Sequence, residues 1–208
     1  MDAIPEDIDL EITAVSERSV RRLRDRLQHG PAPLTHLVAI ERVAPGSDGR
    51  PHREHGWDMS PVTAPLHLLF DEAGWHRPWT TIGIGDGGNE IGMGSLPTDI
   101  INDDIHNGPL IASTIPADHL VVAGVSNWGG YGLVAAMAAL TPEKKPRLLK
   151  YLNREFDLAL LTAAVETGQA VDDSQPDRKG TPRMSVDCVP WEEHAKVIDA
   201  LLGVVVGA

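Results

Sequence analysis

The stretch TTIGIGDGGNEIGMG (residues 80–94) joins the end of a strand to a glycine-rich loop. Residues 80–85 consist of β-branched threonine and isoleucine with glycine, a composition typical of a short buried strand. Residues 86–94 contain too many glycines for a strand or a stable helix. The sequence therefore predicts a loop that begins where a strand ends.

The same order of elements recurs further along the chain. HLVVAGV (119–125) predicts a buried strand, SNWGGYG (126–132) a second glycine loop, and LVAAMAAL (133–140) a helix that Thr141 and Pro142 stop. In parallel sheets, ligands bind beyond the carboxyl ends of the strands. We therefore expect both loops at that edge and the site between them.

The remaining segments complete an alternating pattern. The sequence predicts a helix from Ser16 to Gln28, a strand over 34–43, a long loop over 44–65, a short helix over 66–74, a helix from Pro146 to about Glu166, and a last helix from Pro190 to about Val205. Alternating strands and helices favour an α/β fold with a mostly parallel sheet covered by helices on both faces. The length favours a single domain over residues 1–208.

The composition and charge limit the classes of molecule that the protein is expected to bind. A formal net charge of -12 disfavours nucleic acid and membrane surfaces, because both are bound through clustered lysine and arginine. No uninterrupted apolar stretch reaches the roughly 18 residues of a membrane span. The acidic start, MDAIPEDIDLEI, lacks the basic segment of a signal peptide, so we expect a cytoplasmic location. The single Cys188 excludes a multi-cysteine zinc site. A small-molecule substrate fits best, and a homo-oligomer is compatible with the sequence.

The first glycine loop carries two carboxylates. Gly83, Gly85 and Gly88 have the spacing of a dinucleotide fingerprint, but Asp86 and Glu90 add negative charge where a pyrophosphate would bind. Carboxylates in such a loop suit Mg²⁺ or Mn²⁺, which prefer oxygen ligands. In the alternative interpretation the same carboxylates accept hydrogen bonds from the amides of their own loop. The sequence leaves both open.

Two distant motifs together resemble one family. TIGIGDGGNEIGMG (81–94) with VVAGVSNWGGYGL (121–133) is similar to the C-terminal domain of D-glutamate cyclase, and further matching segments occur in the same order from about Leu37 onward: AIERVAPGSDG (39–49), HGWDMS (55–60), Asp118 and SVDCVPWEEH (185–194). Members of the family usually begin upstream with another glycine-containing segment, so we expect either a shortened member or a site of which part comes from elsewhere. His67 stands where Asp is expected, and Cys188 where Gly is usual.

The resemblance implies a lyase that closes D-glutamate to 5-oxo-D-proline with loss of water. From the position of the loops and the residue types, we hypothesise that Asp86, Glu90 and Asp58 are catalytic residues, with Asp58 as the base, and that Asp86, Glu90 and Asp187 hold a divalent cation, Mg²⁺ or Mn²⁺. Substrate-binding candidates are Asn89, Ser126, Asn127 and Gly129, with Arg42 or Arg53 for the α-carboxylate.

Two other functions remain open from the sequence. A shortened cyclase-like domain could bind a small acidic metabolite without turning it over. An acidic glycine loop also suits a metal-dependent phosphate-ester hydrolase. Phosphatases of the haloacid dehalogenase type fit poorly, because the only D-x-D pattern, Asp7 and Asp9, does not follow a hydrophobic strand.

Overall fold

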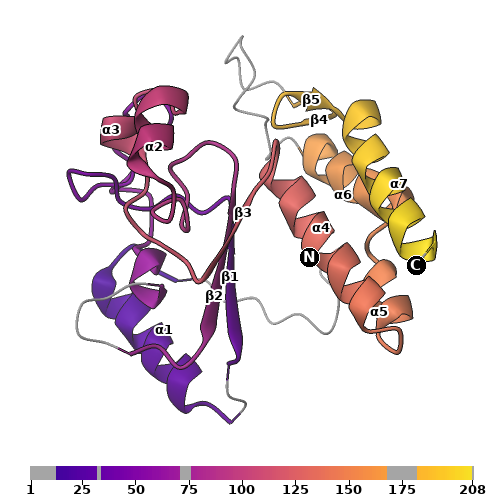
Figure 1. Cartoon of the computed structure of the whole chain (residues 1–208), viewed down its shortest axis with the longest axis horizontal. Helices are drawn as coiled ribbons and strands as arrows, with labels where there is room; N and C mark the ends of the chain where they lie inside the picture. Colours follow the sequence, from indigo (N-terminus) through magenta and orange to yellow (C-terminus); the bar gives the residue numbers. More distant parts are fainter. Residues whose placement is uncertain (1–12, 32–33, 71–75, 168–181, 208) are drawn as a thin grey trace. The chain divides into compact units, whose positions relative to one another are not determined.

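The computed structural model describes residues 13–31, 34–70, 76–167 and 182–207. The chain folds into two compact units, which we call the sheet unit, ending at Ser126, and the helical unit, beginning at Asn127. We describe each unit by itself (Figure 1). The expectation of a single domain over residues 1–208 stays a prediction.

The sheet unit contains a parallel sheet of three strands in the order β1-β2-β3: β1 (His36–Ile40), β2 (Thr80–Gly85) and β3 (His119–Val122). Ile40 pairs with Ile84, and Ile84 pairs with Val121, so the three strands end at nearly the same level. These strands confirm the α/β fold class. The sequence placed the strands correctly and made β1 and β3 too long.

One core of the sheet unit forms where helix α1 (Glu17–His29) and the 3-10 helix η1 (Leu66–Leu69) pack with β1. The Ser16 hydroxyl caps α1 by accepting from the Ser19 amide, as the sequence predicted. Val20, Ala39, Leu69, Phe70 and Trp79 are buried together in this cluster. Two short helices, α2 (Thr98–Asp104) and α3 (Gly108–Ile111), were not predicted.

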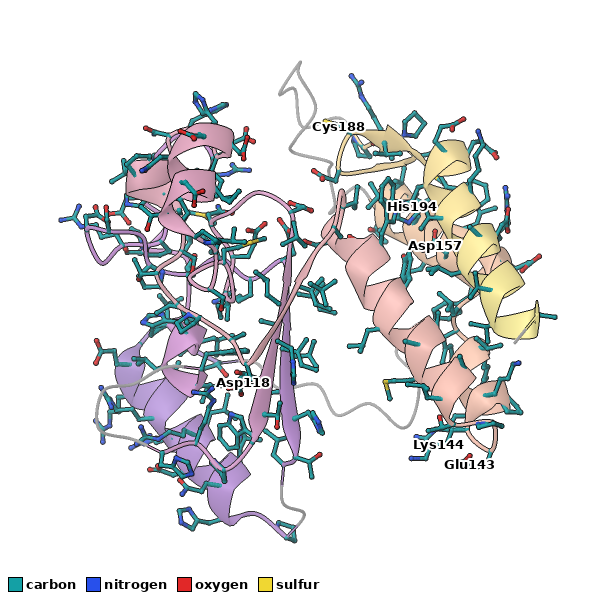
Figure 2. The ribbon with its side chains drawn as sticks, in the orientation of Figure 1. Asp118, Glu143, Lys144, Asp157, Cys188 and His194 are labelled. Atoms are coloured by element: carbon teal, nitrogen blue, oxygen red, sulfur yellow. The ribbon has the colours of Figure 1, made fainter. Side chains whose placement is uncertain are left out.

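The Asp118 carboxylate joins the starts of β2 and β3 (Figure 2). Its Oδ2 accepts from the Thr81 amide at 2.8 Å and from the Thr81 hydroxyl at 2.9 Å, while Arg77 donates to its Oδ1 at 2.6 Å. The backbone hydrogen bond from Thr81, followed by the other two donors, holds the pKa of Asp118 below its ordinary value. This explains why the sequence carries an aspartate directly before β3.

The helical unit consists of α4 (Ser126–Leu140), α5 (Lys145–Leu149), α6 (Arg154–Glu166) and α7 (Trp191–Gly207), with a hairpin of β4 (Ser185–Val186) and β5 (Val189–Pro190). The hairpin turn has φ 49° at Asp187 and φ 65° at Cys188. Both angles lie in the left-handed region that glycine prefers. The glycine that the family usually has in place of Cys188 fits this geometry.

The predicted glycine loop SNWGGYG (126–132) is wrong, because these residues form the first turns of α4. Each glycine weakens a helix by about 1 kcal/mol relative to alanine. Side-chain contacts offset that cost: Tyr131 donates to Asp157 at 2.5 Å, and Trp128 donates to His194 at 3.0 Å. Packing therefore overrides the local preference of the glycines for a loop.

The single helix predicted from Pro146 to about Glu166 is also wrong, because α5 and α6 are separate. Asn153 has extended backbone angles, φ -155° and ψ 159°, and its side chain accepts from the Phe156 amide at 2.8 Å. An asparagine N-cap starts a new helix at this position. The last helix, predicted from Pro190 to about Val205, is confirmed by α7.

A buried polar network joins three helices of the helical unit (Figure 2). Asp157 of α6 accepts from Tyr131 of α4 and, at 2.8 Å, from Trp191 of α7. Trp128 donates to Nδ1 of His194, so the proton of that neutral ring lies on Nε2, which faces Asp157 Oδ2 at 3.8 Å. Burial by itself raises the pKa of Asp157, but the hydrogen bonds of His194, Tyr131 and Trp191 outweigh it and hold the pKa below its ordinary value.

Across the described residues, the structure contains no helix with the length and apolar character needed to cross a bilayer.

The substitution Gly83→Ala should destabilise the protein by roughly 1–3 kcal/mol, the usual cost of overpacking. A Cβ at Gly83 would lie 2.3 Å from the backbone oxygen of Ile91, and backbone cannot move aside as a side chain can. Gly132→Ala is the matched control, since its Cβ would meet nothing within 4 Å and should stabilise α4 by about 0.5–1 kcal/mol. Urea denaturation measures both, and equal stability of Gly83→Ala and wild type would contradict the prediction.

Asp157→Asn should lower the free energy of unfolding by roughly 2 kcal/mol at pH 7, because it disturbs a buried acceptor with several donors. A carboxylate whose pKa is depressed on folding stabilises above its unfolded pKa of about 3.9 and loses that contribution as the pH falls through the folded value. The difference between wild type and variant should therefore shrink below about pH 4. Denaturant titrations from pH 7 to pH 3 test this, with the exposed Asp103→Asn as control. A difference independent of pH would refute it.

Candidate functional site

The carboxyl ends of the three parallel strands lead directly into polar residues. Glu41 follows β1, Asp86 follows β2, and Ser126 lies shortly after β3. The ladder continues past the strand ends, since the Glu41 amide donates to Ile84 O at 3.0 Å and the Ala123 amide to Gly85 O at 3.0 Å. These hydrogen bonds keep the polar residues at the sheet edge, where α/β folds bind ligands.

The glycine loop after β2 folds back onto the segment that follows β1. Val43 and Glu90 form an antiparallel bridge, supported by hydrogen bonds from Ile91 N to Arg42 O at 2.8 Å and from Ala44 N to Asn89 O at 2.9 Å. A Cβ on Gly85 would lie 2.8 Å from Cδ of Glu90. Glycine is therefore required at this position for the Glu90 side chain to lie against the end of β2.

Glu41, Asp86 and Glu90 form what we call the carboxylate cluster. One carboxylate oxygen from each residue lies within 4.8 Å of the others, and within the described ranges this is the group with the geometry of a cation site. Glu41 is exposed, Asp86 is half-buried, and Glu90 is 1% exposed. The cluster therefore extends from the surface into the interior.

The two oxygens of Glu90 have different surroundings. Oε1 accepts from the Asp86 amide at 3.0 Å and from the Gly87 amide at 2.8 Å, while Oε2 is buried and has no hydrogen-bond partner among the residues described. Burial is the largest cause that raises the pKa of Glu90, and the charge of Asp86 raises it further against the loop amides. The interpretation in which a carboxylate accepts from the amides of its own loop is thus confirmed for Oε1 of Glu90, and cation binding stays a prediction.

Ser126 adds polar groups beside Asp86. Its amide donates to Asp86 Oδ2 at 2.7 Å, and its hydroxyl oxygen is buried without a partner within the described part of the chain. The structure therefore brings together three of the candidates, Asp86, Glu90 and Ser126. Oxygen atoms of this kind fit a hard divalent cation.

Glu41 was not among the predicted site residues. The sequence prediction ran the first strand to Val43 and so treated Glu41 as part of the sheet, whereas β1 ends at Ile40. Glu41 has φ 53°, in the left-handed region. A charged residue placed directly after a buried strand was the signal that could have identified it.

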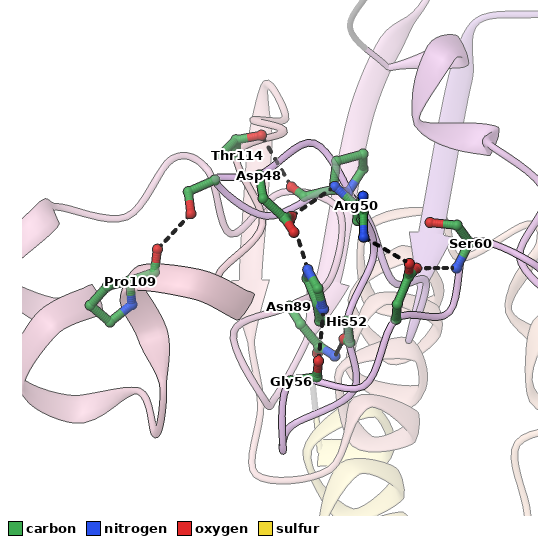
Figure 3. Close-up of polar contacts among 11 residues, drawn as sticks. Asp48, Arg50, His52, Gly56, Ser60, Asn89, Pro109 and Thr114 are labelled. Atoms are coloured by element: carbon green, nitrogen blue, oxygen red, sulfur yellow. Dashed lines mark hydrogen bonds and ion pairs between the residues drawn. The ribbon is translucent and has the colours of Figure 1, made fainter.

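Asn89 connects the glycine loop to the long loop 44–65 (Figure 3). Its amide nitrogen donates to His52 O at 2.7 Å. His52 is buried, and its ring contacts Gly56 O through Nδ1 at 3.0 Å and Asp48 Oδ1 through Nε2 at 2.9 Å. Asn89 therefore holds the two loops together, and substrate binding by its amide stays a prediction.

The other candidates of the sheet unit lie in or next to the long loop. Arg42 donates to Ala64 O at 2.5 Å, its Nε is buried without a partner in the described structure, and burial lowers its pKa. Asp58 accepts from the Ser60 amide at 2.8 Å and lies 3.5 Å from Arg50 (Figure 3). The hydrogen bonds from Ser60 hold the pKa of Asp58 below its ordinary value, which makes it a weaker base. The Arg53 amide donates to Trp57 O within the same loop.

Three candidates belong to the helical unit. Asn127 and Gly129 lie in the first turn of α4, and Asp187 lies in the turn between β4 and β5. Their predicted contributions to substrate and cation binding stay predictions.

A separate cavity of about 300 Å³ opens between the start of α1 and the long loop. Its described lining includes Ser16, Glu17, Thr63 and His67 but no arginine or lysine. A dicarboxylate would meet one carboxylate there and no guanidinium. Within the described ranges no group of three potential cation ligands lies at this cavity, whereas a cation at the carboxylate cluster would offset the charge of a dicarboxylate, so the cluster is the better candidate site.

Comparisons with known proteins agree with the motifs. The profile of the family described as "D-glutamate cyclase-like, C-terminal" matches residues 4–202, a range that starts upstream of Leu37. The mitochondrial D-glutamate cyclase of Homo sapiens is 40% identical over 105 residues, which make up 50% of this chain and 17% of that protein. Because the profile covers nearly the whole sequence, this chain belongs to the D-glutamate cyclase-like family and corresponds to its C-terminal part.

Proposed function

We propose that this protein is a lyase that closes D-glutamate to 5-oxo-D-proline with loss of water, assisted by a divalent cation that Asp86 and Glu90 hold. Family membership and the name of the human relative support the reaction class. The observation that supports a bound cation is the buried Oε2 of Glu90, which lies beside Asp86 and has no hydrogen-bond partner among the described residues. A buried carboxylate oxygen without a partner is costly, and a bound cation would remove that cost.

The reaction makes two demands on the site. The α-amine must be neutral to attack, and the γ-carboxylate must lose its charge before it becomes electrophilic. A bound Mg²⁺ or Mn²⁺ supplies Lewis acidity for the second demand. The carboxylate cluster by itself would repel a dicarboxylate substrate, since like charges at this separation oppose each other in a partly buried site.

Residues of the sheet unit have the chemistry to orient the substrate. The buried Ser126 hydroxyl, beside Asp86, is available to hydrogen-bond a carboxylate. The half-buried guanidinium of Arg42, whose Nε has no partner in the described structure, is the candidate that we favour for the α-carboxylate, and Arg53 is the alternative. Asp58 as base is the weakest of these proposals, because its pKa is depressed. The roles of Asn127, Gly129 and Asp187 rest on their residue types and on the positions predicted from the sequence.

The name of the human relative places that protein in the mitochondrion. The cytoplasmic location expected for this chain is therefore a proposal to be tested by fractionation, as is assembly into a homo-oligomer by light scattering.

Purified protein incubated with D-glutamate and Mn²⁺ should form 5-oxo-D-proline, because the site combines cation ligands with hydrogen-bond donors at one sheet edge. Chiral chromatography measures the product, with L-glutamate as the parallel substrate. D-glutamate binding in calorimetry without any product would instead support a non-catalytic binding module. Turnover of p-nitrophenyl phosphate would support the hydrolase.

Glu90→Gln keeps the volume of the side chain and removes its charge. Turnover should fall by roughly 100-fold or more, as expected when an electrostatic group of the site is lost. The melting temperature should stay equal or rise, because burial already disfavours the charged form of Glu90. The exposed Glu54→Gln is the matched control and should keep full turnover. Full activity of Glu90→Gln would remove this residue from the mechanism.

A further inference from the structure

We propose that Glu41 is a third carboxylate ligand of the cation site, which makes it an all-oxygen site for Mn²⁺ or Mg²⁺. The inference rests on the proposed function only in that it concerns the same site. It adds a residue from the end of β1 to the pair on the glycine loop, so the cation would join two neighbouring strand ends.

Geometry is the first support. One oxygen each of Glu41, Asp86 and Glu90 lies within 4.8 Å of the others, although Glu41 follows β1 and the other two residues follow β2. All three donors are carboxylates, which are hard ligands that Mg²⁺ and Mn²⁺ prefer over softer metals. Glu41 is exposed and Glu90 is buried, so the three ligands extend from the surface to the interior.

The buried oxygen of Glu90 is the second, independent support. Proteins rarely leave a buried polar atom unpaired, and such an atom in a native structure calls for a ligand, an ion or a water. Glu90 is 1% exposed, and its Oε2 has no partner in the described structure. Because Oε1 is fixed by two loop amides, rotation of the carboxylate cannot satisfy Oε2 without breaking those bonds.

The backbone of Glu41 agrees with a functional side chain at this position. At φ 53°, an L-residue is disfavoured by contact of its Cβ with the backbone, whereas glycine is not. The hydrogen bond from the Glu41 amide to Ile84 O, at 3.0 Å, holds this conformation. A glutamate at this φ is thus unfavourable for the backbone, and cation binding by its side chain would explain why glutamate is present in place of glycine.

The test is a titration with Mn²⁺ alone, followed by electron paramagnetic resonance, since the signal of free Mn²⁺ falls as the ion binds. Wild type should show one tight site per chain. Glu41→Gln, which keeps the side-chain shape, should weaken that site by at least about ten-fold. Glu41→Gly removes the carboxylate and suits the left-handed backbone, so its melting temperature without cation should be equal or higher. The rise in melting temperature on adding Mn²⁺ should be lost in both variants.

Glu54→Gln removes the same charge from an exposed position and should bind Mn²⁺ like wild type. Wild-type affinity in Glu41→Gln, or no tight site in wild type, would overturn the inference. The proposed function is tested separately. If the chain binds Mn²⁺ through Glu41 but forms no 5-oxoproline, this inference is supported and the lyase function is refuted. If the wild-type chain forms 5-oxoproline and the Glu41→Gln variant binds Mn²⁺ with wild-type affinity, the lyase function is supported and Glu41 is not a ligand.

Discussion

The arrangement of the candidate site depends on the hydrogen bonds from the Asp86 and Gly87 amides to one oxygen of Glu90. These bonds fold the glycine loop so that Glu90 points inward, against the end of β2. Gly85 leaves the space that this side chain occupies. The same bonds leave the second oxygen of Glu90 buried and unpartnered in the described structure, and this is the oxygen that we propose as a cation ligand.

The strand ends supply the rest of the site because the sheet is parallel. Strands that run in one direction deliver their carboxyl-terminal residues to one edge, and Glu41, Asp86 and Ser126 all lie there. Negative charges gathered in this way repel one another and would repel an anionic substrate. The divalent cation that we propose would resolve both difficulties, so cation binding and the proposed dicarboxylate chemistry are compatible at one site.

The helical unit uses its aromatic residues differently. Trp128 and Tyr131, which the sequence placed in a loop, anchor α4 through His194 and Asp157. Trp191 and His194 of the SVDCVPWEEH segment complete the same network. The second predicted glycine loop and the SVDCVPWEEH segment thus supply, in part, a buried structural core. Buried networks of this kind are stabilising only when their members are satisfied, as Asp157 is here.

The sequence by itself determined the family, the α/β class, the positions of the three strands, and the pair Asp86 and Glu90, because strand composition and a glycine loop are local signals. Tertiary structure decided what local signals could not. Residues 126–132 became helical because distant partners on α6 and α7 offset the cost of their glycines. Glu41 joined Asp86 and Glu90 because strand pairing brings together residues 45 to 49 positions apart, a proximity that the linear sequence does not encode in any local pattern.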